Sequence, residues 1–231
     1  MALGATISQR ITDLIGSEYA TIPSLSYKDL IVAAFNEVAD MVSVDILLKY
    51  SPVAAQQLAA DVANGYNVED KKILLVLRRD GDSLDRACSA LTLPEYNAAK
   101  DTGSIYQATK FSPVYTIDSN NATGPLRILP DCTDTEKGFI YYFNYATNST
   151  DLTGIDSAEL HSIYNMPSNL IHDVVLKSCL NILLAYISEQ IQDEEDVELM
   201  QMIQNQIQGL EKAFLQEMQR FVVEGVKVKG E

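Results

Sequence analysis

Two long amphipathic helices, predicted between Met166 and Val223, constrain this fold more than any other part of the chain. Pro167 suits a first helical turn, where its missing N–H would have no intrahelical partner. Apolar residues then recur at three- and four-residue steps, at Ile171, Val175, Cys179, Ile182, Leu183, Tyr186 and Ile187. After an acidic break, the same period returns at Val197, Met200, Ile203, Ile207, Leu210, Phe214 and Phe221. Neither helix can bury its apolar face alone, so we expect a helical hairpin packed on further helices.

The N-terminal part of the chain also has helical patterns. A short helix over residues 7–15 should end at Gly16, because glycine is common just after a helix. A longer apolar pattern covers residues 26–50. The Ala- and Gln-rich run over 53–62 favours helix by intrinsic propensity. We therefore expect residues 1–70 to be helical.

The pattern changes at Lys71. The aliphatic run Ile73–Leu77 is typical of either a strand or a helix end, and residues 86–93 alternate loosely up to Pro94. Short strands are predicted at 104–111, 113–117 and 126–129, and most clearly in the aromatic run 139–145. The predicted fold class is α+β, mainly α: a helical bundle of residues 1–70 and 155–223 with long C-terminal helices, and a β-rich insert of residues 71–154.

Residues 224–231 are predicted to be a flexible, extended C-terminal tail, because Gly225 should end the last helix. In this tail Val226 and Val228 alternate with Lys227 and Lys229. Such alternation suits addition of a strand to the edge of a partner's sheet, and an unstructured terminus is the other interpretation.

Composition limits the classes of function. The formal charge is −15, so general binding to nucleic-acid phosphates is not expected. Cys88, Cys132 and Cys179 are widely spaced and form no C-x-x-C pair, so we expect reduced, structural thiols. The first residues lack the pattern of a secretory signal, and no stretch is expected to approach a membrane span of roughly 18 apolar residues. A soluble protein made in the cytoplasm is predicted.

The sequence contains few motifs typical of catalysis or of metal or phosphate binding. His161 and His172 lie eleven residues apart, which is not the spacing of a helical zinc pair, and no nucleophile elbow or phosphate-binding glycine loop occurs. Residues 193–196 are four adjacent acids that suit either a hard cation or the start of a helix. Tyr141, Tyr142 and Tyr145 suit either stacking on a base or sugar, or packing in a strand. We predict no catalytic residues, metal or cofactor.

The order of three stretches resembles the head-to-tail connector, or adaptor, proteins of tailed bacteriophages, including the tail tubular proteins of short-tailed phages. The first is Tyr27-Lys28-Asp29-Leu30-Ile31, which opens a helix. The second runs from Ser104-Ile105-Tyr106 through Ser112-Pro113-Val114-Tyr115 to Leu126-Arg127-Ile128-Leu129-Pro130. The third is Met166-Pro167-Ser168 with the helix after it, the acidic residues 193–196 and the last helix.

This resemblance implies a structural virion protein and not an enzyme. It implies a homo-oligomeric ring, commonly twelvefold, that docks beneath the portal protein of a capsid, extends the DNA channel and joins the next neck or tail protein. The expected location is the virion neck, after synthesis in the host cytoplasm. DNA would pass through the channel without sequence-specific binding, and no membrane is involved. The candidate portal-docking residues are Val226, Lys227, Val228 and Lys229.

Two other classes stay open on the sequence. Carboxylate pairs can act as acid and base without any motif, so a cytosolic enzyme with a carboxylate site is one alternative. The other is a helical module that binds a peptide in a groove. An acidic pocket in a monomer would favour the enzyme, whereas assembly into a ring would favour the connector.

Overall fold

A computed structural model describes residues 5–17, 19, 27–51, 55–58, 65–81, 84–118, 120, 125–133, 135–147, 150–190 and 197–227. The chain divides into two compact units. Unit 1 combines the two ends of the chain, Met1–Pro52 and Tyr145–Glu231, and unit 2 is the segment between them, Val53–Asn144. The fold is mixed, with helices in unit 1 and mainly strands in unit 2, which confirms the α+β class.

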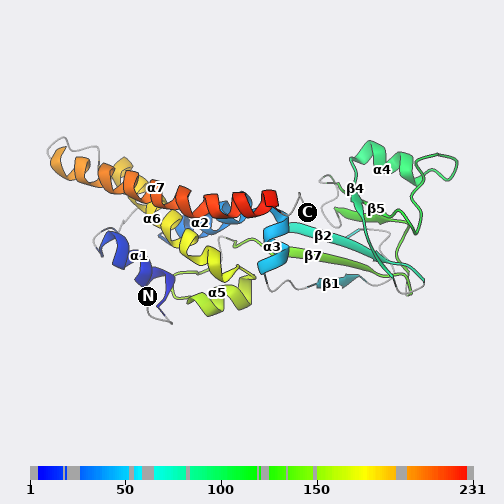
Figure 1. Ribbon diagram of the computed structural model, residues 1–231, viewed down its shortest axis with the longest axis horizontal. Helices are drawn as coiled ribbons and strands as arrows, with labels where there is room; N and C mark the ends of the chain where they lie inside the picture. The colour runs from blue at the N-terminus through cyan, green and yellow to red at the C-terminus, as the bar shows by residue number, and fades with distance from the viewer. Residues whose placement is uncertain are drawn as a thin grey trace. The chain divides into compact units, whose positions relative to one another are not determined.

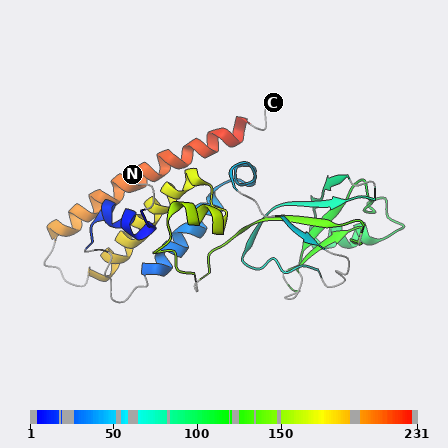
Figure 2. The ribbon, with the colours of Figure 1, turned by 90° about the horizontal axis from the view of Figure 1, so that it is seen from below.

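Unit 1 is built from α-helices and includes the short 3₁₀ turn η2. Their bounds are α1 Ile7–Ile15, α2 Tyr27–Met41, α3 Val44–Tyr50, α5 Ser157–Tyr164, η2 Ser168–Leu170, α6 Ile171–Gln190 and α7 Val197–Lys227. Helix α6 contacts α1, α2 and α7, and both views of the ribbon show α7 running alongside α6 (Figure 1, Figure 2). The predicted pair of long C-terminal helices that pack on each other and on further helices is therefore present.

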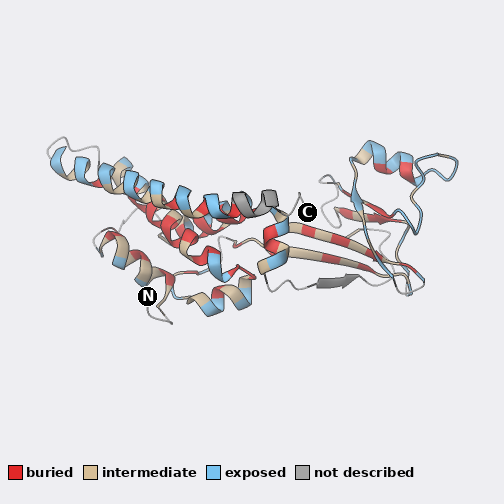
Figure 3. Cartoon of the chain, viewed as in Figure 1, coloured by how far each residue is buried: buried red, intermediate tan, exposed pale blue. Residues whose placement is uncertain are grey.

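Helix α6 supplies the centre of the unit 1 core, as its red colouring shows (Figure 3). Its buried apolar residues are Ile171, Val174, Val175, Leu176, Cys179, Leu180, Ile182 and Leu183. They surround the helix on more than one face, because neighbours pack on several sides. Helix α7 is amphipathic instead, and the buried residues among its described side chains form a stripe of Ile203, Phe214, Met218 and Phe221.

Among the described residues, one helical segment, Ser168–Glu189, is long and apolar enough to cross a membrane by length and composition, with a mean hydropathy of 1.6. The prediction that no stretch approaches such a span was therefore wrong on composition. Within unit 1, however, 61% of the most apolar window is buried against protein. Packing of α1, α2 and α7 around α6 accounts for that apolar composition.

The starts of α1 and α5 lie next to each other in unit 1. Thr6 caps α1, with reciprocal hydrogen bonds to Gln9, and Asp156 caps α5 in the same way with Glu159. Thr6 and Asp156 form an antiparallel bridge, and the Ile7 N–H donates to the Ile155 carbonyl at 3.0 Å. This bridge joins the first helix to the segment that follows unit 2. The sequence analysis did not predict α5.

The described residues of unit 2 form two small sheets and one helix. The strands are β1 Ala55–Leu58, β2 Lys71–Arg79, β3 Asp85–Ala87, β4 Ser89–Ala90, β5 Val114–Ile117, β6 Leu126–Leu129 and β7 Gly138–Asn144, and the helix is α4 Leu93–Lys100. One sheet is antiparallel with the order β1-β7-β2-β3. The other has the order β4-β5-β6, with β4 parallel to β5.

The two sheets and α4 form three layers in unit 2. Val76 and Ile140 of the first sheet pack against Leu126 and Ile128 of the second. The opposite face of the second sheet, with Val114 and Leu129, packs against Tyr96 and Ala99 of α4. Alternate residues of β6 therefore enter different cores, as the period of two in a strand requires.

The structure confirms several predicted elements and corrects others. Residues 71–79 are a strand, so the strand alternative for Ile73–Leu77 is correct, and the strands at 113–117, 126–129 and 139–145 are confirmed as β5, β6 and β7. The helix predicted over 53–62 is wrong, because residues 55–58 pair with β7. Propensity separates most residues by only about 0.7 kcal/mol, so strand pairing prevails. Accordingly, the β-rich unit spans 53–144 and not 71–154.

Residues that favour turns and helix starts explain why three other predicted elements differ in the structure. The pattern over 26–50 is divided, because Ser43 has an extended backbone (φ −66°, ψ 150°) and begins α3. Pro94 lies in the first turn of α4 and ends no strand, since proline suits that position. Residues 104–111 form turns and not a strand, because Asp101 and Ser104 accept hydrogen bonds from nearby backbone N–H groups.

Candidate functional site

The predicted docking residues lie at and beyond the end of α7. This helix continues to Lys227, so it includes Val226 and Lys227, and the prediction that it ends at Gly225 was wrong. One glycine costs a helix about 1 kcal/mol, which a 31-residue helix anchored by Phe214 and Phe221 can tolerate. Val228, Lys229 and the acidic residues 193–196 lie outside the described residues.

The candidate groups for catalysis have structural contacts. His161 Nδ1 lies 2.8 Å from the Met166 carbonyl oxygen, where it links the end of α5 to the start of η2. Cys88, Cys132 and Cys179 are free thiols, and burial raises the pKa of Cys88 and of Cys179 to about 12. At neutral pH these two cysteines are therefore thiols and poor nucleophiles. Within the part of the chain that the structure describes, no three His, Cys, Asp or Glu side chains are grouped to hold a metal.

The strand tyrosines take part in packing. Tyr142 packs against the core of unit 2, and the Lys71 ammonium lies 5.4 Å from the centre of its ring. Tyr145 donates a short hydrogen bond to Asp40 of α2 in unit 1. Burial and this carboxylate raise the pKa of the Tyr145 hydroxyl. These contacts favour the packing interpretation of Tyr142 and Tyr145 over the stacking one.

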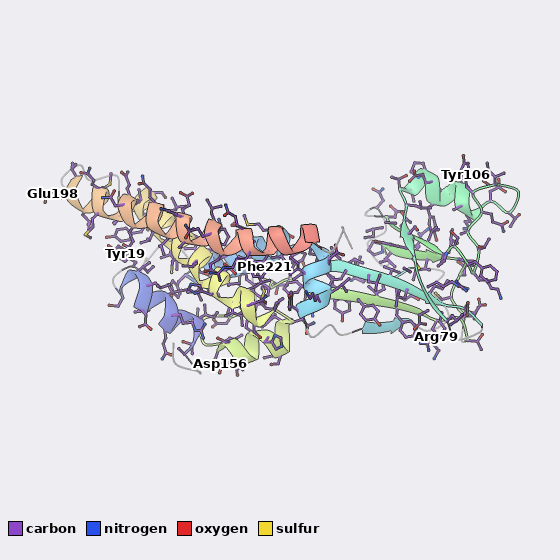
Figure 4. All side chains as sticks on the ribbon, viewed as in Figure 1. Tyr19, Arg79, Tyr106, Asp156, Glu198 and Phe221 are labelled. Atoms are coloured by element: carbon purple, nitrogen blue, oxygen red, sulfur yellow. The ribbon has the colours of Figure 1, made fainter. Side chains whose placement is uncertain are left out.

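A network of charged side chains holds together the end of β2 in unit 2, near the labelled Arg79 (Figure 4). The Arg78 guanidinium is 1% exposed and donates to the Pro130 carbonyl at 2.8 Å, the Asp131 carbonyl at 3.2 Å and the Glu136 carboxylate. On the other side, buried Asp80 accepts from the Leu84 N–H and from Arg86.

This network has a structural role. Arg78 fastens the segment 130–136 to β2, and Asp80 fastens the turn between β2 and β3. Arg79, the residue between them, is partly exposed, and its guanidinium pairs with Asp85 at 2.8 Å and 3.0 Å. The alternation of buried and exposed side chains follows the pleat of the strand. The sequence analysis did not predict this network. Leu74, Val76 and Arg78 are alternate residues of a strand, however, so their spacing places the Arg78 side chain on the same buried face as the two apolar side chains.

Asp173, in the first turn of α6, is a buried acidic residue with an incompletely satisfied carboxyl group among the described residues. Its side chain is 1% exposed, and its Oδ1 has no hydrogen-bond partner among the described residues. Burial, and then the nearby Glu217 charge on α7, raise the pKa of Asp173 from 3.8 to about 7, against the opposing effect of Arg220. Glu217 and Arg220 form an ion pair at 2.6 Å on α7. The contact between α6 and α7 therefore contains a carboxyl group that is best accommodated when neutral.

Asp173→Asn should make unit 1 more stable at alkaline pH. The folded state of the parent binds more protons than the unfolded state between about pH 4 and pH 7, so its stability falls as pH rises through that range. The substituted amide would carry no charge, so the variant should gain roughly 1–3 kcal/mol above pH 7 and little below pH 4. Urea unfolding at several pH values, followed by circular dichroism, measures this. A pH-independent difference would contradict it.

The loop between α4 and β5, residues 101–113, exposes three large apolar side chains of unit 2, and we call it the apolar loop. Ile105 is 91% exposed, Tyr106 is 72% exposed and Phe111 is 64% exposed. Figure 4 labels Tyr106 in this loop. Backbone hydrogen bonds fix its shape: the Ala108 N–H donates to the Ala99 carbonyl of α4 at 2.9 Å, and Ser112 donates to Thr109 at 3.1 Å. The loop is therefore structured without burying Ile105, Tyr106 and Phe111.

Exposed apolar residues also lie on the two long helices of unit 1. Leu184 of α6 is 52% exposed, and Val197 and Met202 of α7 are 69% and 57% exposed. Val197 is the first residue of α7, next to the labelled Glu198 (Figure 4). Sequence reasoning assigned Val197 to the buried face, because the heptad-like pattern does not show where a helix extends beyond its neighbours.

Comparison with known proteins identifies no relative. A scan against protein-family models matches none of them, and a search of curated proteins finds no match to this chain.

Proposed function

We propose that this protein is a head-to-tail connector of a tailed bacteriophage, a structural ring component that docks under the portal and joins the capsid to the tail. The observation that carries the proposal is the order of features along the chain. A helical N-terminal segment, a β-rich segment over 53–144 and two long C-terminal helices follow one another, as the resemblance implies. A helical bundle with a β-rich insert is the architecture expected of that family.

The distribution of charge supports a role beside DNA without binding to it. Residues 53–144 hold nine Lys or Arg and twelve Asp or Glu, a formal charge of −3, so −12 falls on the remaining residues. Acidic residues that face a channel repel the DNA backbone, which favours sliding over adhesion. In this proposal the helical unit lines or flanks the channel, and its acidic excess opposes retention of the duplex.

The C-terminal end is the proposed portal contact. Since Val226 and Lys227 belong to α7, strand addition there would first require the last helical turn to unwind. We therefore assign docking to the end of α7 together with Val228, Lys229 and the two residues after them. A partner would have to supply enough contacts to offset the ordering of these terminal residues.

Electron microscopy of negatively stained protein, alone and mixed with a portal ring, tests the proposed function. We expect rings, or added density on one end of the portal, and no enzymatic turnover is needed for this readout.

Deleting residues 225–231 should leave the melting temperature unchanged while weakening attachment to the portal. Protein that neither forms rings nor binds the portal at any concentration would contradict the connector proposal. Normal attachment of the truncated protein would remove only the docking role of the C-terminal end.

A further inference from the structure

The apolar loop exposes side chains that a solvated turn does not require. Ile105 and Tyr106 are adjacent, they are 91% and 72% exposed, and turns on both sides hold them outward. Burial of such side chains is favourable by about 25 cal/mol per Å² of apolar surface. Aromatic residues at the centre of a contact are also the ones that most often dominate binding energy. A structured loop that presents them is therefore suited to insertion into a partner.

The charge around the loop differs from that of the whole chain. The Phe111 ring has the Arg86 guanidinium 5.1 Å from its centre and the Lys110 ammonium at the same distance. Lys100 ends α4 directly before the loop, and Asp101 is the only acidic residue within it. Arg86 is paired with Asp80, so Lys100 and Lys110 against Asp101 leave a formal charge of +1 at the loop. On a chain with a formal charge of −15, the loop is thus an apolar surface with a small positive excess. An acidic, apolar surface would complement it.

The start of α7 has that complementary character. Val197 and Met202 are exposed apolar residues, and Glu198 is exposed between them. The residues just before α7, 193–196, are all acidic in the sequence, and residues 197–210 contain no Lys or Arg. Apolar side chains with acidic neighbours therefore occur on unit 1, and apolar side chains with basic neighbours occur on unit 2.

We propose that the apolar loop of one copy of this protein binds the Val197–Met202 end of α7 on a second copy. The two surfaces are different, so the contact is heterologous, and repetition of such a contact forms a ring where the rotation between copies closes. This inference rests on the proposed ring and names the contact that closes it. Ile105 and Tyr106 supply the buried anchors, and Lys110 and Glu198 supply attraction at the edge of the contact.

Two variants separate the two sides of the contact. The loop variant carries Ile105→Ser and Tyr106→Ser, and the helix variant carries Val197→Ser and Met202→Gln. Sedimentation velocity up to roughly 200 µM would detect contacts with micromolar dissociation constants. We expect the parent to associate with rising concentration and each variant to associate at least about tenfold more weakly. Leu84→Ser and Leu215→Gln are matched controls, since these residues are 57% and 56% exposed but lie outside both surfaces.

Mixing the two variants gives the decisive result. The helix variant keeps an intact loop and the loop variant keeps an intact α7 surface, so the mixture should form a one-to-one pair that neither variant forms alone. A mixture that stays monomeric would overturn the proposal, and so would a parent that is monomeric throughout the concentration range. If the loop variant forms the same rings as the parent, this contact is wrong while the connector function stands. Binding of the parent to the portal tests the proposed function separately.

Discussion

Replacing Ile182 by Asp should leave little soluble folded protein. Ile182 is fully buried in α6, the helix that contacts α1, α2 and α7. An ionised carboxylate there would have no compensating charge, and even the protonated form would leave polar atoms without partners. The expected loss is several kcal/mol, roughly 4 or more, which is a large part of the stability of an ordinary domain. The soluble yield and the thermal unfolding of unit 1 by circular dichroism measure it.

Leu184→Asp is the matched control for this prediction. Leu184 lies two residues further along the same helix and is 52% exposed, so the same charge would remain hydrated there. We expect a change within about 0.5 kcal/mol, as for other surface substitutions. If Ile182→Asp unfolds within a degree or two of the parent, then this face of α6 is not part of the core and the arrangement of unit 1 is wrong.

Arg78→Ala should produce the second largest loss, this time in unit 2. The substitution removes the donor for two backbone carbonyls and leaves the Glu136 carboxylate without its ion pair. Removal of one partner of a buried pair typically costs 3–5 kcal/mol, and we expect about 3 here because Glu136 is 28% exposed and partly hydrated. The chain has no tryptophan, so urea unfolding would be followed by circular dichroism and tyrosine fluorescence.

Arg79→Ala, the neighbouring substitution, provides the comparison. Arg79 and Asp85 form an ion pair in which both side chains are more than one third exposed. Such surface pairs contribute little to stability, since water and salt screen them. Equal losses for Arg78→Ala and Arg79→Ala would show that the buried network does not hold the 130–136 segment. A double-mutant cycle with Glu136→Gln would assign the part of the effect that belongs to the pair itself.

The contrast between these neighbours shows what kind of information the sequence carries. Helices α1, α6 and α7 were predictable, because their apolar residues repeat at the helical period over many turns. Strand β7 was predictable from its run of aromatic and β-branched residues. The short elements were not: β1 has a helix-favouring composition, and residues 104–111 have strand-favouring residues in a chain of turns. For β1 the outcome depends on pairing with β7, which no local pattern shows, whereas the turns over 104–111 follow from hydrogen bonds that Asp101 and Ser104 accept locally.

For the candidate surfaces too, some features follow from the local sequence and others only from contacts between distant residues. The exposure of Ile105 and Tyr106 cannot be inferred from residue types, because apolar residues are usually taken as core. The turn residues Asp101, Gly103 and Ser104 just before them were the available signal. For Asp173, the sequence shows an acid in a first helical turn, which is ordinarily favourable. Only the tertiary structure shows that this carboxyl group is buried, which together with the Glu217 charge on α7 raises its pKa, while Arg220 opposes the shift.

The sequence by itself determined the α+β class, the two long C-terminal helices and the acidic balance, because periodicity and composition are properties of the chain alone. The tertiary structure decided which residues form each unit, that segment 55–58 pairs with β7, and that Arg78 is buried while Arg79 is partly exposed. It also decided which apolar side chains of the loop and of α7 remain uncovered. The physical reason is that burial and pairing depend on contacts between residues far apart in the chain, each of which outweighs a local preference of a few tenths of a kcal/mol.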